Sequence, residues 1–263
     1  MPARPRIPLT SVLASISFLV LVLGSSAWSQ EGSDKPASRP ATGALSLIVR
    51  YEGKPPVLPP FGIPPAWRRM FKNDGEFCQK CLEKGELFDE RLQIGKTGGV
   101  RNVAVSFPRL KAPRADSGRP VLDNLSCRFS PHVFFVPVGE SILVKNSDPL
   151  THNAHLRRKG GRPFCNLLVP ARGSSRTPKI SRPGLYEVSC DIHPWMKAFF
   201  IGTRNACHTV TDEAGKGVIE GIPPGRDLLL VLWHETLGSA RKKVSISPGS
   251  RVELRLTQKD FKR

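Results

Sequence analysis

Alternating apolar and polar positions mark the C-terminal end of the chain as a β-strand. Within residues 251–257, Val252, Leu254 and Leu256 alternate with charged or polar neighbours, which is the period of a strand with one buried face. A Pro-Pro-Gly turn at residues 223–225 is typical of the punctuation between such runs. Other apolar runs of strand length cover residues 44–51, 100–107, 131–138, 141–145, 185–189, 197–201, 227–233 and 243–247. Short strands separated by turn signals predict an all-β sandwich.

Two stretches depart from the strand pattern. Residues 53–65 carry six prolines, and proline lacks the backbone donor that a sheet or helix needs, so we expect an irregular crossing loop. Residues 66–87 mix apolar and charged residues around Cys78 and Cys81. We expect a short helix there.

The first residues have the pattern of an export leader. Arg4 and Arg6 precede an apolar run at residues 12–24, which is too short to span a bilayer comfortably. A small-x-small site follows, so we expect a cleaved leader at residues 1–29 and a polar tether at residues 30–43. An uncleaved membrane anchor is the alternative. The expected location is the periplasm or the cell exterior.

The chain is strongly basic, with a formal net charge of +18. Such a charge favours acidic redox partners or an anionic membrane or wall surface, while export disfavours nucleic acid. The basic stretches at residues 157–159, 172–182 and 241–243 lie in loop-like segments. They are either docking sites or an ordinary solvated face.

Six cysteines occur in a chain expected in an oxidising compartment, where an even number usually forms disulfides. We expect Cys127 to pair with Cys78 or Cys81. Cys165 and Cys207 either pair or stay free. A thioredoxin-like role for the Cys-x-x-Cys pair would need a βαβ context that the pattern lacks.

The segment CDIHPWM at residues 190–196 carries the most specific chemistry. It places a thiolate, an imidazole and a thioether at Cys190, His193 and Met196. His152 follows the apolar run 142–144 in an upstream segment and supplies a second imidazole. Two imidazoles, one thiolate and a weak axial thioether are the ligands of a type 1 copper site. The sequence therefore predicts one such copper ion.

Competing interpretations use the same residues. Cys190 would be structural, His193 on the surface and Met196 in the core if no metal binds. Zinc is disfavoured by a methionine ligand. The HExxH zinc motif fails after His234 and Glu235, because position 238 is glycine. Without paired His-x-His motifs or a Gly-x-Ser-x-Gly elbow, we expect no enzyme activity of the chain's own.

The segments VKNSDPLTHNAH and CDIHPWM resemble the copper loops of the cupredoxins, and the short spacing from His193 to Met196 is similar to that of amicyanin. The resemblance implies that His152, Cys190, His193 and Met196 are the ligands. It implies that Asn153 ties the two ligand loops together. His155 corresponds to a family histidine that is not a ligand.

A wider resemblance links the chain to exported proteins of the methylamine-utilisation or plastocyanin-like type. It is carried by CRFSPHVFFVPVGESILVKNSDPLTHNAH, PGLYEVSCDIHPWMKAFF and TDEAGKGVIEGIPPGRDLLLVLWHETLG. It implies a cupredoxin-like Greek-key sandwich at residues 44–207 and a carboxypeptidase-regulatory-like β segment at residues 208–263. Cys165 and Cys207 have no clear counterpart in this pattern.

The implied function is single-electron transfer between redox partners, with docking at Pro194 and Trp195 beside an exposed edge of His193. A non-redox copper-binding or cell-surface β-sandwich module is the alternative. The remaining histidines are expected to be structural, with His132 buried and satisfied and His208 on a surface turn.

Overall fold

The computed structural model describes residues 41–114, 118–161 and 163–262. The predicted leader and residues 30–40 of the predicted tether lie outside this part of the chain, and Gly43 already begins the first strand. No helix among the described residues is both long and apolar enough to cross a membrane.

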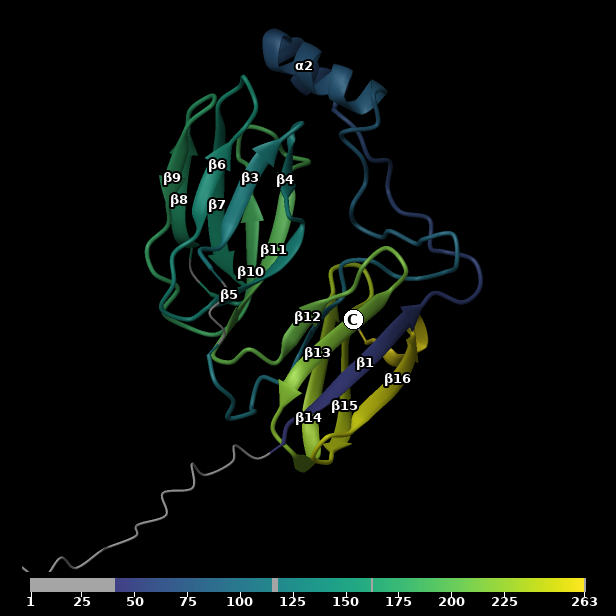
Figure 1. The fold of residues 1–263 in the computed structure, drawn as a ribbon. Helices are drawn as coiled ribbons and strands as arrows, with labels where there is room; N and C mark the ends of the chain where they lie inside the picture. The colour runs from purple at the N-terminus through teal and green to yellow at the C-terminus, as the bar shows by residue number, and fades with distance from the viewer. Residues whose placement is uncertain (1–40, 115–117, 162, 263) are drawn as a thin grey trace, which may run out of the picture. The chain divides into compact units, whose positions relative to one another are not determined.

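The fold class is all-β, as predicted (Figure 1). The helices are α1 (Pro65–Met70), α2 (Lys72–Glu83) and the short 3-10 turn η1 (Gln258–Asp260). The strands are β1 (Gly43–Arg50), β2 (Ala104–Ser106), β3 (Val121–Leu125), β4 (Arg128–Ser130), β5 (Val133–Pro137), β6 (Leu143–Asn146), β7 (His152–Arg158), β8 (Pro163–Val169), β9 (Ser174–Arg176), β10 (Gly184–Ser189), β11 (Lys197–Thr203), β12 (His208–Val210), β13 (Lys216–Ile222), β14 (Gly225–His234), β15 (Gly238–Ile246) and β16 (Arg251–Thr257).

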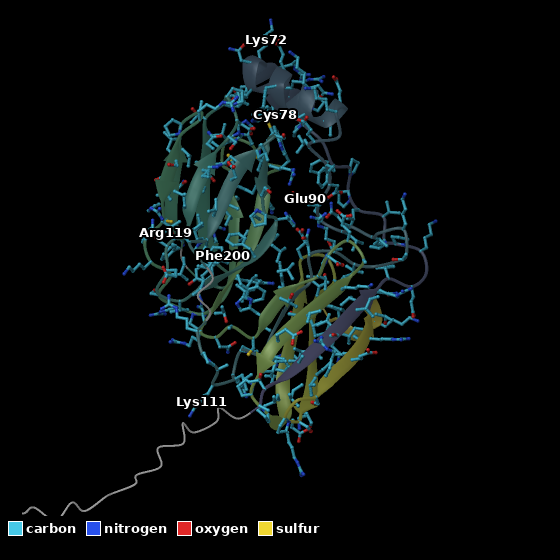
Figure 2. All side chains as sticks on the ribbon, in the orientation of Figure 1. Lys72, Cys78, Glu90, Lys111, Arg119 and Phe200 are labelled. Atoms are coloured by element: carbon cyan, nitrogen blue, oxygen red, sulfur yellow. A yellow bond between two sulfur atoms is a disulfide. The ribbon has the colours of Figure 1, made fainter. Side chains whose placement is uncertain are left out.

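One pair of sheets carries the candidate ligands. Their strand orders are β5-β11-β10-β7-β8 and β4-β3-β6-β9. Their inner faces share one apolar core, in which the rings of Tyr186 and Phe200 stack with centroids 4.5 Å apart. Phe200 is labelled in Figure 2. The alternation of buried and exposed residues on these strands sets which side chains face the core.

A second pair of sheets has the orders β13-β1-β16 and β12-β2-β14-β15. Strand β1 pairs parallel with β16 and antiparallel with β13. Its alternate residues Leu45, Leu47 and Val49 are buried in a core that also contains Phe107 and Leu232. In Figure 1 the purple strand β1 accordingly lies among the green and yellow strands of the C-terminal part.

The strand pairing divides the chain differently from the predicted boundaries 44–207 and 208–263. Strands β1 and β2 precede the ligand-bearing sheets in sequence, yet both pair with C-terminal strands. The ligand-bearing sandwich is therefore an insertion between β2 and β12. The physical reason is that both strands that pair with β1 in its sheet, β13 and β16, lie more than 150 positions away in the sequence. Local periodicity does not indicate such long-range pairing.

The helical segment confirms the helix expected around the Cys-x-x-Cys pair. Cys78, labelled on α2 in Figure 2, forms a disulfide with Cys127. This is one of the two pairings predicted for Cys127. Cys81, Cys165, Cys190 and Cys207 are free. Cys165 and Cys207 are therefore two free thiols and do not form a disulfide with each other.

Candidate metal centre

Two neighbouring strand ends bring the predicted ligands together. Strand β7 begins at His152, and β10 runs antiparallel beside it, with Ser189 opposite His155. The end of β10 therefore lies next to the start of β7, and Cys190 follows at once. The residues His152, Cys190 and His193 are all buried, and each offers a ligand atom within 4.8 Å of the other two.

The loop between β10 and β11 folds back on itself. The backbone nitrogen of Cys190 donates to the carbonyl of Met196 at 3.3 Å, and the nitrogen of Met196 donates to the carbonyl of His193 at 2.9 Å. The Nδ1 atom of His193 lies 3.6 Å from the Cys190 Sγ atom. Met196 is buried in the apolar core beside this loop. Its role as an axial ligand stays a prediction.

His152 is held by a buried carboxylate. Its Nε2 atom lies 3.0 Å from Asp148 Oδ2, and Asp148 also accepts hydrogen bonds from the backbone nitrogens of Ser126 and Cys127 at 2.6 and 2.8 Å. The Nδ1 atom of His152 is buried and has no hydrogen-bond partner. A carboxylate that orients a ligand imidazole through its second nitrogen is a frequent feature of metal sites. The geometry thus leaves Nδ1 available for a metal.

Burial and neighbouring charges keep His193 neutral. Burial, together with the charge of His152, lowers the pKa of His193 to about 3. Burial alone would also lower the pKa of His152, but the hydrogen bond to Asp148, together with the nearby Cys190, outweighs it and raises that pKa. A neutral imidazole has a free lone pair, which is the form that binds a metal.

Asn153 connects the two ligand segments. Its side-chain oxygen accepts from the backbone nitrogen of Asp191 at 2.8 Å and from the Cys190 thiol at 3.2 Å. Its amide donates to Asp191 and Asn166, both at 2.8 Å. These contacts link the start of β7 to the loop after β10, and a role of Asn153 in supporting a metal stays a prediction. His155 contacts Asp191 at 3.1 Å and is not a member of the His-Cys-His cluster.

A helical cover, formed by α1 and α2, lies over the ligand loop. The indole nitrogen of Trp67 donates to the carbonyl of Ile192 at 2.7 Å. The Trp67 ring lies 5.1 Å from the His193 ring and 4.7 Å from the Trp195 ring. From α2, Asp74 Oδ2 approaches His193 Nε2 to 3.7 Å. No local pattern in the sequence indicates these contacts, because the two segments are more than a hundred residues apart.

The cover bears on two expectations about the loop tip. The ring of His193 is 0% exposed, so the prediction of an exposed ring edge is wrong: aromatic and helical residues occupy that face. Pro194 is exposed and Trp195 is half-buried, with its indole nitrogen donating to the Cys127 carbonyl at 3.1 Å. Whether Pro194 and Trp195 serve as a docking patch stays a prediction.

The other histidines divide into one confirmation and one correction. His132 is buried and hydrogen-bonded, as predicted. His208 is not on a surface turn but on β12, where its ring stacks on Phe135 at 4.1 Å. Burial lowers the pKa of His208 to about 4. The apolar neighbours supplied by the adjacent sheet explain why the surface prediction is wrong.

The donor set fits a soft metal ion such as copper better than magnesium or calcium. It combines a buried thiol with two imidazoles, each of which has one buried nitrogen without a hydrogen-bond partner, and it lies beside a buried thioether. Soft sulfur ligands together with imidazole are typical of blue-copper sites, whereas magnesium and calcium prefer oxygen.

No protein-family model matches the chain, and no curated protein matches it. Solved structures resemble part of it. A Cu-containing nitrite reductase from Thermus scotoductus SA-01 is 23% identical over 35% of this chain and 24% of its own, with a TM-score of 0.30. A purple cupredoxin from Nitrosopumilus maritimus is 19% identical over 32% of this chain and 99% of its own, with a TM-score of 0.29. An amicyanin variant is 19% identical over 34% of this chain and 85% of its own, with a TM-score of 0.30. The chain spans about a quarter of the reductase's length.

Proposed function

We propose that the protein is an exported type 1 copper protein that carries single electrons between redox partners. The observation that carries the proposal is the buried convergence of His152, Cys190 and His193, with the Nδ1 atom of His152 left without a partner. A buried polar nitrogen without a partner costs about 1–3 kcal/mol. A metal ion at this position would remove that cost.

Each residue has a defined task in this proposal. Cys190 supplies the thiolate, while His152 and His193 supply neutral imidazoles. Met196 would supply a weak thioether. Copper held by these residues would supply one-electron chemistry, by cycling between Cu(I) and Cu(II).

The surrounding residues hold the donors in place. Asp148 fixes the orientation of His152, and Asn153 fixes the backbone at Asp191 beside Cys190. The helical cover excludes water from His193. Donors that are fixed in this way do not need to move when the charge of the site changes, so the reorganisation energy stays small.

The partner is proposed to be acidic. The net charge of +18 includes only Arg4 and Arg6 from the predicted leader, so its removal leaves a strongly basic protein. Opposite charges speed encounter between redox partners. The predicted leader supports a location in the periplasm or outside the cell.

The test is to add Cu(II) to the mature protein and record the visible spectrum. An intense thiolate-to-copper band, with reversible reduction, is expected. Cys190→Ser should abolish the band, whereas the matched control Cys165→Ser should keep it. Met196→Leu should keep the colour and raise the reduction potential.

The outcomes separate the alternatives. A band that survives Cys190→Ser would contradict the ligand assignment. Stoichiometric copper binding without reversible reduction would favour a non-redox copper-binding module instead.

A further inference from the structure

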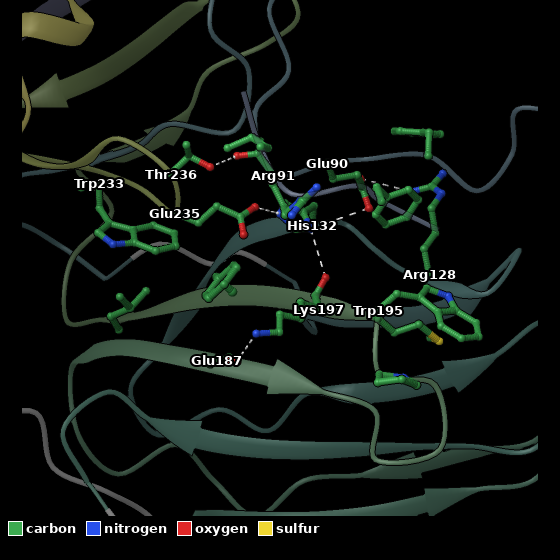
Figure 3. Close-up of a pocket in the computed structure, with 18 of the residues that line it drawn as sticks. Glu90, Arg91, Arg128, His132, Glu187, Trp195, Lys197, Trp233, Glu235 and Thr236 are labelled. Carbon is green, nitrogen blue, oxygen red and sulfur yellow. Dashed lines mark hydrogen bonds and ion pairs between the residues drawn. The ribbon is translucent and has the colours of Figure 1, made fainter. Parts of the chain in front are cut away.

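A cavity of about 860 Å³ lies beside the candidate copper loop. Its wall includes Trp195 and Met196, but not His152, Cys190 or His193. Other parts of the wall come from the proline-rich loop, from β11 and from the turn between β14 and β15. Figure 3 shows Trp233 and Trp195 at opposite ends of the view, with Glu235, His132 and Glu90 between them. The volume lies in the range of small-molecule sites.

The polar part of this wall is a buried acid–base cluster. His132 Nδ1 lies 3.1 Å from the carbonyl of Lys197, and His132 Nε2 contacts the carboxylate of Glu235. A carbonyl and a carboxylate both accept hydrogen bonds. Each ring nitrogen must therefore carry a proton, and His132 is an imidazolium whose two donors are already used.

The two carboxylates remain as acceptors. Glu90 Oε2 lies 3.7 Å from His132 Nδ1, and Glu90 Oε1 lies 3.4 Å from Arg128. Glu90 and Glu235 are 12% and 13% exposed, and both line the cavity. A carboxylate has about four acceptor positions, so these contacts leave room for more donors. A ligand here must bring hydroxyl or amine hydrogens.

The charges of the cluster balance. His132 and Arg128 offset Glu90 and Glu235, so an added ion would lack a partner within the cluster. An uncompensated charge in a largely buried site is strongly disfavoured. The rest of the wall adds Arg91 and Lys197, which pair with Asp89 and Glu187, and the cations Lys159 and Lys262, so an amine cation is disfavoured. A carboxylate has no hydrogens to donate to Glu90 and Glu235, which leaves a neutral hydroxyl donor as the favoured ligand.

The remaining walls are rich in aromatic rings. They come from Phe61, Phe88, Trp195, Phe199 and Trp233. Aromatic rings prefer offset or edge-to-face packing against another ring. A flat aromatic molecule fits these walls, and its hydroxyl groups could reach the carboxylates.

We propose that this cavity binds a neutral aromatic diol, of the hydroquinone or catechol class, as a reductant of the copper site. The redox part rests on the proposed function. The diol transfers one electron to Cu(II), giving Cu(I), and one hydroxyl proton to the carboxylate of Glu235, leaving a semiquinone. Two semiquinones disproportionate to one quinone and one diol. The overall reaction thus reduces two Cu(II) ions per diol oxidised and releases two protons.

The binding test uses the metal-free protein, so that it does not depend on copper. Calorimetric titration with hydroquinone under anaerobic conditions is compared with 1,4-dimethoxybenzene, which has the same ring but no donors. Dimethoxybenzene should bind at least about ten-fold more weakly, because hydrogen bonds to charged groups are lost. Glucose is a third probe, since sugars also combine hydroxyls with an affinity for aromatic faces.

Variants locate the binding site. Glu235→Gln should weaken hydroquinone binding at least about ten-fold, while Glu253→Gln, an exposed position on β16, should leave it unchanged. Absence of binding to the native protein would overturn the proposal. So would equal binding of dimethoxybenzene or tighter binding of glucose. Because the ligand controls use the native protein, the result stands even if a variant folds poorly.

The redox step is tested on the copper-loaded protein. Bleaching of the visible band by hydroquinone should saturate with concentration, and Glu235→Gln should slow it without changing the band or the potential. Binding without saturable reduction would overturn the reductant role. Absence of the visible band would instead contradict the proposed function, while the binding titration still decides whether the cavity takes a diol.

Discussion

The disulfide between Cys78 and Cys127 ties the helical cover to the turn that supports the metal centre. Replacing both cysteines with alanine removes this cross-link and leaves Cys81 no partner at position 127. The bond joins residues separated by 49 positions, for which loop-closure entropy predicts a loss of about 4 kcal/mol. For a domain of this size, that loss corresponds to a fall in melting temperature of roughly 8–16 °C.

The cover should then open more often, although other contacts still hold it. The hydrogen bond from Trp67 to Ile192 contributes about 1 kcal/mol. The two ring contacts of Trp67, with His193 and Trp195, add about 0.5–1.5 kcal/mol each. The cover therefore stays docked most of the time, but transient openings expose the ligand loop. Cys190, which is 3% exposed in the closed form, becomes accessible to reagents.

Two measurements on the metal-free protein check this reasoning. Calorimetry gives the change in melting temperature, and iodoacetamide labelling resolved by mass mapping gives the labelling rate of Cys190. Cys165→Ser is the control, because that thiol is unbonded and half-buried. A melting temperature within about 2 °C of the native value would refute the loop-closure estimate. A large fall in melting temperature with unchanged labelling of Cys190 would show that the cover does not shield the centre.

Other changes probe the support of the centre, its pH dependence and its partners. Asp148→Asn should weaken copper affinity about 10–100-fold in a chelator competition, because the carboxylate orients His152; unchanged affinity would remove this role. Burial would lower the pKa of His132, but the hydrogen bond and charge of Glu235 outweigh burial and raise it. The protonated ring thus stabilises the fold fully below about pH 6.5, and this stabilisation is lost as pH rises through the folded-state pKa. The free energy of unfolding, measured with denaturant from pH 6 to 9, should therefore fall, and His132→Gln should make this pH dependence weaker. Replacing residues 157–159 with glutamate should slow electron exchange with an acidic partner at low salt and leave the copper spectrum unchanged; a rate insensitive to salt and to these changes would indicate an ordinary solvated face.

The local part of the candidate metal centre could be predicted from the sequence. Cys190, His193 and Met196 lie within one seven-residue loop, so their spacing alone limits them to one neighbourhood. His152 required the further assumption that its segment ends beside that loop. The antiparallel pairing of β7 and β10 shows that it does. The strand prediction at residues 251–257 was also exact, because period-two alternation is a local property.

The partners from distant segments could not be predicted. Trp67 and Asp74 reach His193 from a part of the chain that carries no copper-loop pattern. Strand β8 is absent from the predicted strands for two reasons. It begins with Pro163, and apolar and polar residues do not alternate along its sequence PFCNLLV. The prediction for residues 100–107 was too long: β2 covers only Ala104–Ser106, and Asn102 adopts a φ of 63°, which interrupts an extended strand.

The insertion of one sandwich into another has a consequence for the site. The turn after β14 supplies Glu235, and β5 is preceded by His132, so a contact between the two sandwiches forms the acid–base cluster beside the copper loop. Neither sandwich alone has both members of this pair. Because β1 and β2 pair with strands that follow the insertion, the outer sandwich can close only after the chain of the inserted one has been made. A fold of this kind can place a cavity against a candidate metal centre without altering the ligand loop, which is held by Asn153 of β7, by hydrogen bonds within the loop and by Trp67 of the helical cover.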